Sequence, residues 1–316
     1  MWTAIALWAV IGAGVVAFAS GAAHAIRAGA SPWPWITAIP LVYLGSLLVF
    51  VAGYFTLAWT RRAPRPAYAK LSWRRALRLF RREYLAIAGS APRMMGYRAV
   101  TRDPPPAPAA DPILLLHGVL CNGGVWRSLK RRLRKAGLGP VYAPSYGPPL
   151  ASIELFADQI AAKIDRILAA TGARQVSIVA HSMGGIVARA YVRKHGGGKV
   201  RRVITIGTPH EGSAHAWLFP GTSLGQLRPG NPWLAALPEP SAASPPFVSV
   251  WSWHDSMVAP QTSARLRHGR NVEIVGVGHN ALLTDPDVAQ KVIDELRRGQ
   301  VIDPTPKSPA TSESLG

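Results

Sequence analysis

Residues 176–185 read Val176-Ser177-Ile178-Val179-Ala180-His181-Ser182-Met183-Gly184-Gly185, and they constrain the fold more than any other part of the chain. A run of β-branched apolar residues is typical of a buried strand, and the glycines after it mark a sharp turn into a helix. Such a turn presents a serine hydroxyl at the carboxyl edge of a sheet, provided that the residues two positions away are small. Ala180 and Gly184 meet this requirement, so the pattern predicts that Ser182 is a nucleophile.

On both sides of this turn, short apolar runs alternate with longer helical patterns over residues 111–300. This alternation is typical of a parallel sheet that is covered by helices on both faces. The apolar runs predict strands at residues 113–116, 141–143, 176–180, 203–207, 247–251 and 272–277. The helical patterns lie at residues 125–136, 153–171 and 183–195. We therefore expect an α/β domain.

A second motif lies upstream, where Ile113-Leu114-Leu115-Leu116-His117-Gly118-Val119-Leu120 reads as a strand followed by a loop. Together the two motifs resemble the α/β-hydrolase superfamily. Ala180 occupies a position where glycine is commoner, and in this feature the sequence resembles bacterial lipases and esterases. The resemblance implies the α/β-hydrolase fold, with a mostly parallel sheet flanked by helices. It also implies that the backbone N–H groups of Val119 and Met183 bind the oxyanion of an acyl-transfer intermediate. For His117, the resemblance implies a structural role and not a catalytic one.

The resemblance further implies a catalytic triad in the chain order serine, acid, histidine. His279 stands just past the last apolar run, where the family places its base. Asp255 follows the preceding predicted strand and is the expected acid. Glu273 and Glu239 are the alternative acids. The predicted triad is therefore Ser182, Asp255 and His279.

A long insertion follows residues 207–213, a segment that also resembles lipase-type members of the superfamily. Residues 214–246 are rich in proline, glycine and tryptophan and predict a cap or lid over the site. The alternative is an ordinary surface loop. The apolar side chains expected to line an acyl-chain pocket are Trp217, Phe219, Leu224, Trp233 and Leu237.

Composition restricts the partners and cofactors. The chain has 316 residues and a formal net charge of +20, which favours contact with anionic surfaces, either nucleic acid or acidic lipid. Its single cysteine, Cys121, excludes an intrachain disulfide and is interpreted as a packing residue. The inferred chemistry needs no cofactor, and no acidic cluster suggests a structural calcium or another metal.

The N-terminal region is uncharged over residues 2–23 and 28–60, apart from a short connection that includes His24 and Arg27. Each stretch is long enough to cross a bilayer as a helix, and the turn-forming residues 31–34 lie close to the connection, at the start of the second stretch. Residues 1–60 therefore predict a transmembrane helical hairpin. The alternative for the first stretch is a cleaved signal peptide, because Ala23-His24-Ala25 has the small-x-small pattern of a cleavage site.

A basic segment follows the hairpin, and residues 61–110 predict a juxtamembrane helix and a proline-rich spacer. Its first cations are Arg61, Arg62, Arg65, Lys70, Arg74, Arg75, Arg78, Arg81 and Arg82. Because such clusters remain on the cytoplasmic side, we expect a multi-pass inner-membrane protein whose catalytic domain, residues 111–300, faces the cytoplasm. Residues 71–88 predict an amphipathic helix that lies on anionic lipid or docks on the catalytic domain. Residues 301–316 are predicted to be disordered.

Taken together, these features predict a membrane-anchored serine hydrolase of carboxylic esters, with a medium-chain or lipid ester as its substrate. A membrane-bound acyltransferase or thioesterase would use the same triad and stays open from sequence. A non-catalytic basic protein that binds nucleic acid would not need the ordered motifs. We therefore expect an ester and the membrane as partners, and no nucleic acid.

Overall fold

A six-stranded parallel sheet forms the centre of the molecule. The computed structural model describes residues 2–241 and 244–298, so the predicted tail at residues 301–316 lies outside the described residues. The strands run in the order β2-β1-β3-β4-β5-β6, and every neighbouring pair is parallel. Their bounds are β1 Ile113–Leu116, β2 Val141–Tyr142, β3 Val176–His181, β4 Val200–Ile206, β5 Phe247–Ser252 and β6 Arg270–Ile274. The predicted parallel-sheet architecture is confirmed.

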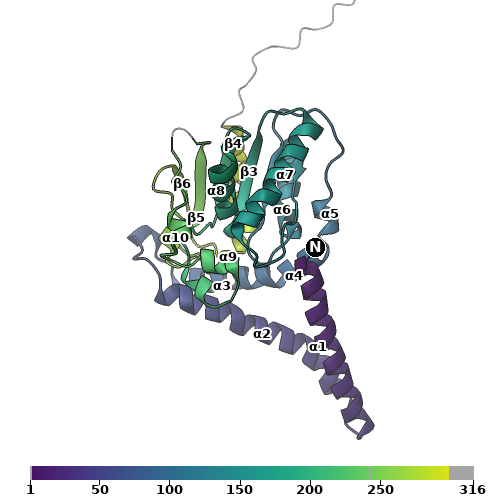
Figure 1. Ribbon diagram of the computed structural model, residues 1–316. Helices are drawn as coiled ribbons and strands as arrows, with labels where there is room; N and C mark the ends of the chain where they lie inside the picture. The colour runs from purple at the N-terminus through teal and green to yellow at the C-terminus, as the bar shows by residue number, and fades with distance from the viewer. Residues whose placement is uncertain (1, 242–243, 299–316) are drawn as a thin grey trace, which may run out of the picture.

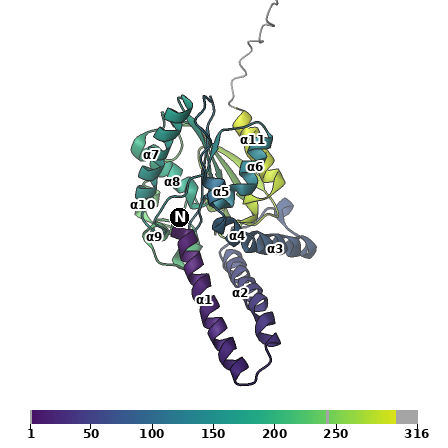
Figure 2. The same cartoon turned by 90° about the vertical axis from the view of Figure 1, so that its right-hand side faces the viewer.

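Helices cover both faces of this sheet, as Figure 2 shows. One face packs against α7 (Ile153–Thr171) and α8 (Met183–His195), and the other packs against α6 (Arg127–Lys135) and α11 (Pro286–Arg297). Successive residues of a strand point to opposite faces. In β1, for example, Leu114 and Leu116 join the first core, whereas Ile113 and Leu115 join the second.

Most predicted elements agree with the observed bounds to within one residue, whereas β4 begins three residues earlier and α6 two residues later than predicted. The helices predicted at 153–171 and 183–195 coincide with α7 and α8. Strand β6 ends at Ile274, earlier than predicted, and Gly276 two residues later has a φ of 76° that strands do not adopt. Helix α11 was not predicted, although its signals are present: Asp285 caps the amides of Asp287 and Val288.

The predicted cap consists of three short helical segments between β4 and β5. They are η3 (Ala214–Trp217), α9 (Thr222–Gln226) and α10 (Pro232–Ala235). The buried leucines of this insertion join the core that α7 and α8 form with the sheet, namely Leu224, Leu227, Leu234 and Leu237. The Gln226 side chain also accepts a hydrogen bond of 2.8 Å from the amide of Ile153 at the start of α7. The insertion is therefore a packed part of the domain.

The N-terminal region forms a helical hairpin of α1 (Trp2–Arg27) and α2 (Trp33–Thr60), which projects from the rest of the molecule (Figure 1). The rings of Phe18 and Trp35 meet edge to face at 5.6 Å across the hairpin. Among the described residues, α2 is the one helix that is long and apolar enough to cross a membrane. That the hairpin crosses a bilayer stays a prediction.

The segment after the hairpin docks on the catalytic domain. It contains η1 (Ala67–Ala69), α3 (Trp73–Ala88), α4 (Ser90–Met95) and α5 (Arg98–Thr101). In α3, Leu79, Glu83 and Ala86 are buried, whereas Trp73 and Leu77 are exposed. Of the two alternatives for residues 71–88, the structure contains the docked helix. The proline-rich residues 103–108 form neither helix nor strand, as expected for a spacer.

Candidate active site

The turn at Ser182 connects β3 to α8 and holds the serine in an unusual backbone conformation. Ser182 has a φ of 56° and a ψ of −129°, which residues other than glycine rarely adopt. The crossing is tight, because a Cβ atom added to Gly184 would lie 2.4 Å from the carbonyl oxygen of Leu116. Ala180 is fully buried on the other side of the turn. The small residues that flank Ser182 are thus required by close backbone approach.

His279 and Asp255 form a buried hydrogen-bonded pair. The distance from His279 Nδ1 to Asp255 Oδ2 is 2.9 Å, and the side chains are 4% and 1% exposed. The other carboxylate oxygen of Asp255 accepts hydrogen bonds from the amides of Met257 and Val258 at 2.8 and 2.7 Å. These amides fix the carboxylate, which in turn orients the imidazole and leaves its Nε2 atom for another partner.

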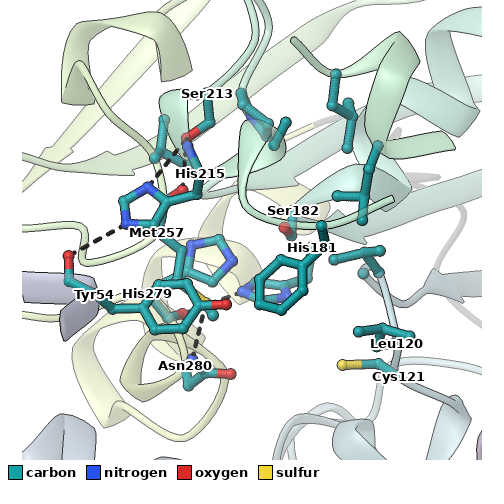
Figure 3. A pocket seen from close by; sticks show the side chains of 18 of the residues that line it. Tyr54, Leu120, Cys121, His181, Ser182, Ser213, His215, Met257, His279 and Asn280 are labelled. Carbon is teal, nitrogen blue, oxygen red and sulfur yellow. Dashed lines mark hydrogen bonds between the residues drawn. The ribbon is translucent and has the colours of Figure 1, made fainter. Parts of the chain in front are cut away.

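Ser182 and His279 line the same cavity, which has a volume of about 220 Å³ (Figure 3). The oxyanion loop contributes Gly118 and Val119 to its wall. Helix α8 begins at Met183, directly after Ser182, which lines the cavity. Amides at a helix N-terminus stabilise negative charge. Val119 lines the cavity and Met183 directly follows Ser182, and the binding of an oxyanion by their amides stays a prediction.

The electrostatic environment of His279 favours its protonated form. Burial lowers the pKa of His279, but the charge and hydrogen bond of Asp255, together with the charge of Glu83, outweigh burial and raise the pKa above its usual value. The neighbouring His181 behaves oppositely, because burial and the proximity of His279 hold its pKa well below the usual value. His181 Nε2 lies 3.1 Å from the carbonyl oxygen of His279. His181 is thus a neutral support for the base.

The oxyanion loop is stabilised by His117. Its Nδ1 atom lies 2.9 Å from the carbonyl oxygen of Gly118, and burial lowers the pKa of His117 to about 4. The ring of Tyr146 stacks on the imidazole with a centroid distance of 4.0 Å, and its hydroxyl donates to the carbonyl oxygen of His117. These contacts agree with the structural role expected for His117.

Two of the five predicted acyl-pocket residues line this cavity, namely Phe219 and Leu224. Trp217 does not. Its side chain is exposed and stacks with the guanidinium group of Arg228 at 4.4 Å. The assignment of Trp217 to the pocket is therefore wrong, because the short helix η3 turns this ring towards solvent.

Trp233 and Leu237 also lie away from the cavity, so these two assignments are wrong as well. The indole Nε1 of Trp233 donates to Glu154 Oε1 of α7 at 2.8 Å. Leu237 is buried in the core beside α7 and α8. Both residues hold the cap against the domain, because the insertion folds onto α7 and only its first half reaches the site.

Helix α2 supplies cavity residues that the sequence did not predict, Phe50 and Tyr54. The ring of Tyr54 stacks on His215 of the cap at 5.0 Å with an interplanar angle of 4°. His215 Nε2 also donates to the carbonyl oxygen of Tyr54 at 3.2 Å (Figure 3). Contacts between segments so distant in sequence leave no local pattern.

The alternative acids have other partners. Glu273 accepts hydrogen bonds from the Tyr68 hydroxyl at 2.6 Å and from the Trp253 indole at 3.0 Å. Glu239 pairs with Arg189 at 3.3 Å. Neither contacts His279. Within residues 2–241 and 244–298, no group of three or more His, Cys, Asp or Glu side chains is arranged to hold a metal ion.

Comparison with known proteins agrees with the fold. A family model described as alpha/beta hydrolase fold matches residues 111–238. A triacylglycerol lipase of Pseudarthrobacter phenanthrenivorans is 46% identical over 59 residues, which are 19% of this chain and 18% of that lipase. A triacylglycerol lipase of Burkholderia plantarii is also 46% identical over 59 residues, 19% of this chain and 16% of that protein. The match thus spans less than a fifth of these curated relatives.

Two solved structures share the architecture. The mature form of the Bacillus licheniformis lipase BlEst2 has a TM-score of 0.53 and 20% identity, and the similarity covers 61% of this chain and 95% of that one. Aspergillus fumigatus lipase B has a TM-score of 0.53 and 19% identity, with coverage of 60% and 53%. The protein has the α/β-hydrolase fold.

The close approach at Gly184 leads to a stability prediction. In Gly184→Ala, the new methyl group meets backbone atoms that cannot rotate away, so we expect a loss of about 1–3 kcal/mol in the free energy of unfolding. Urea unfolding of the detergent-solubilised protein measures this loss. Gly225→Ala is the matched control, because a Cβ atom there meets nothing within 4 Å. Equal stability of the two variants would contradict the packing described for the turn.

Proposed function

We propose that this protein is a membrane-anchored serine hydrolase that cleaves carboxylic esters through Ser182, His279 and Asp255. The observation that carries the proposal is the buried pair of His279 and Asp255 at the cavity that Ser182 lines. A serine hydroxyl is a weak nucleophile, and a histidine that is oriented by a carboxylate activates it. The strained turn exposes the hydroxyl to this base.

The reaction proceeds in two steps. His279 Nε2 removes the hydroxyl proton of Ser182 as the serine oxygen attacks the ester carbonyl carbon, and the amides of Val119 and Met183 stabilise the oxyanion. When the intermediate collapses, the bond to the alcohol oxygen breaks and His279 returns the proton to the departing alcohol. A water molecule, deprotonated by His279, then attacks the acyl-enzyme and releases the acid and the free serine.

The substrate class follows from the character of the cavity, whose wall is largely apolar. Its lining includes Phe219, Leu224 and Leu227 of the cap and Phe50 of α2. An acyl chain buried among such groups gains about 0.8 kcal/mol for each methylene removed from water. We infer that the enzyme prefers medium-chain or lipid esters over short, water-soluble ones.

Membrane anchoring is supported by the exposed surface of the hairpin. Both helices present large apolar side chains outwards, where a soluble protein would carry polar ones. On the described part they include Val15, Val16, Ile26, Trp33, Ile36, Leu41, Val42, Leu48 and Val49. Because α2 also lines the cavity, a hairpin inserted in a bilayer holds the active site close to lipid. The arginines after Thr60 favour the cytoplasmic face of the inner membrane.

The role of the serine can be tested directly. Ser182→Ala removes only the hydroxyl, so we expect loss of ester hydrolysis and of labelling by a fluorophosphonate probe with an unchanged circular dichroism spectrum. Hydrolysis and gel-based labelling of the purified protein measure this. Labelling of the variant at the wild-type level would refute the assignment.

The acyl preference can be tested with p-nitrophenyl esters of increasing chain length. In the wild type, we expect kcat/KM to rise from acetate to a medium-chain ester, and Phe219→Ala to flatten this rise more than it lowers acetate hydrolysis. Trp217→Ala, at an exposed position outside the cavity, serves as the control and should keep the wild-type profile. A preference of the wild type for acetate would contradict a lipid-ester pocket.

The orientation in the membrane gives a further prediction. A reporter fused after Gly316 should be active in the cytoplasm, whereas a cysteine introduced by Ser31→Cys in the turn of the hairpin should react with a membrane-impermeant thiol reagent from the periplasmic side. The single native cysteine, Cys121, is replaced by serine in this background. Periplasmic activity of the reporter would overturn the proposed topology.

A further inference from the structure

A buried carboxylate from the N-terminal region reaches the loops that carry the proposed catalytic acid and base. Glu83 lies on α3 and has no exposed surface. It is the first acidic residue after the hairpin, within a segment otherwise rich in arginine. An acidic side chain is almost never fully buried unless it is paired or hydrogen-bonded. The position of Glu83 therefore calls for a physical explanation.

Both oxygens of Glu83 accept hydrogen bonds from residues next to the triad. Oε1 accepts from Ser256 Oγ at 2.8 Å, from the amide of Asn280 at 2.9 Å and from the Asn280 side chain at 3.0 Å. Oε2 accepts from the amide of Ala281 at 2.9 Å. All four partners are donors, an arrangement that suits an ionised carboxylate.

These partners connect Glu83 to both triad members. Ser256 follows Asp255 directly, and its Oγ atom also accepts a 3.4 Å hydrogen bond from the amide of His279. Asn280 and Ala281 follow His279 in the other loop. One carboxylate on α3 thus holds together two loops that come from different strands of the sheet.

The approach of the carboxylate also depends on the residue before His279. A Cβ atom added to Gly278 would lie 2.5 Å from Glu83 Oε2. Any larger residue there would push the carboxylate away from the loop. The glycine before the base, which the sequence motif contains, is therefore matched to a side chain almost two hundred residues earlier in the chain.

We infer that Glu83 is a positioning residue for the proposed reaction: it fixes the loops of Asp255 and His279 and adds negative charge beside the imidazole. The inference rests on the proposed serine hydrolase function. The segment that matches the family model begins only at residue 111, so Glu83 lies outside it. By this inference the N-terminal segment also belongs to the active-site structure.

The titratable groups around His279 come from four elements. Asp255 follows β5, His181 ends β3, His215 lies in η3 of the cap, and Glu83 lies on α3. Burial lowers the pKa of His181 and of His215, so both rings are neutral near pH 7. Asp255 and Glu83 are thus the groups that stabilise a positive charge on His279, and the charge of Glu83 raises the pKa of His279.

The test compares Glu83→Gln with the wild type. The amide keeps the shape of the side chain but loses the charge and one acceptor. We expect kcat to fall about 10- to 100-fold with little change in KM, because the base is displaced from the serine. The acidic limb of the kcat/KM profile should move to lower pH, because loss of a negative charge destabilises the imidazolium and lowers the pKa of His279.

Arg82→Gln is the matched control. Arg82 is the neighbour of Glu83 on α3 and also anchors this helix to the domain, through an ion pair with Asp285. It has no contact with the loop of His279. If α3 contributes only docking, both variants should lower the stability alike and leave the acidic limb in place. That result would overturn the inference.

A second measurement does not depend on activity. The titration of His279 can be followed by ¹³C NMR of labelled histidine, with His279→Gln to assign the signal. We expect the midpoint to fall in Glu83→Gln and to stay in Arg82→Gln. If the wild type neither hydrolyses esters nor reacts with the fluorophosphonate probe, but the midpoint of His279 still falls in Glu83→Gln, the proposed function alone is refuted. An active wild type whose midpoint and kcat are unaffected by Glu83→Gln would refute the role of Glu83.

Ser256→Ala covers the case in which Glu83→Gln does not fold. It removes the hydroxyl that joins Glu83 to the amide of His279, but keeps the carboxylate in place. We expect a several-fold loss of kcat with the acidic limb unmoved, because geometry changes and charge does not. An unchanged kcat in this variant would contradict the positioning role.

Discussion

The close crossing of backbone at Ser182 is the constraint on which the rest of the molecule depends. Because Gly184 and Gly185 have no side chains, α8 can begin directly against the end of β1 and against Thr208 after β4. This contact fixes the start of α8 directly after Ser182, which lines the cavity. The sheet order then brings the loops after β5 and β6 to the same edge. The site is thus a consequence of parallel strands and one tight turn.

Two buried carboxylates, Asp255 and Glu83, hold the proposed base from different parts of the chain. Each is surrounded by donors, so the cost of removing its charge from water is offset by hydrogen bonds. Asp255 orients the imidazole directly, whereas Glu83 acts through Ser256 and the amides beside His279. Their combined charge favours the imidazolium that forms when the serine loses its proton. The base is therefore supported from the catalytic domain and from the N-terminal region alike.

The N-terminal region contributes to the site in a second way, because α2 forms part of the cavity wall. The stack of Tyr54 on His215 joins this helix to the cap, and Phe50 faces the apolar interior. An anchor and a substrate pocket are commonly separate parts of a molecule. Here the same helix serves both proposed roles, so the path from bilayer to nucleophile would be short.

The sequence by itself determined the parallel α/β sheet and the turn at Ser182, because each depends on local periodicity or on residues that are adjacent in the chain. The order of the candidate triad was implied by the resemblance of these motifs to a known family. The sequence did not determine which residues line the cavity: Trp233 contacts Glu154 instead, and Phe50 of α2 lines the cavity although only cap residues were expected there. It also gave no sign of the role of Glu83. Those contacts join segments far apart in sequence, and their geometry depends on how helices and loops pack, which only the tertiary structure decides.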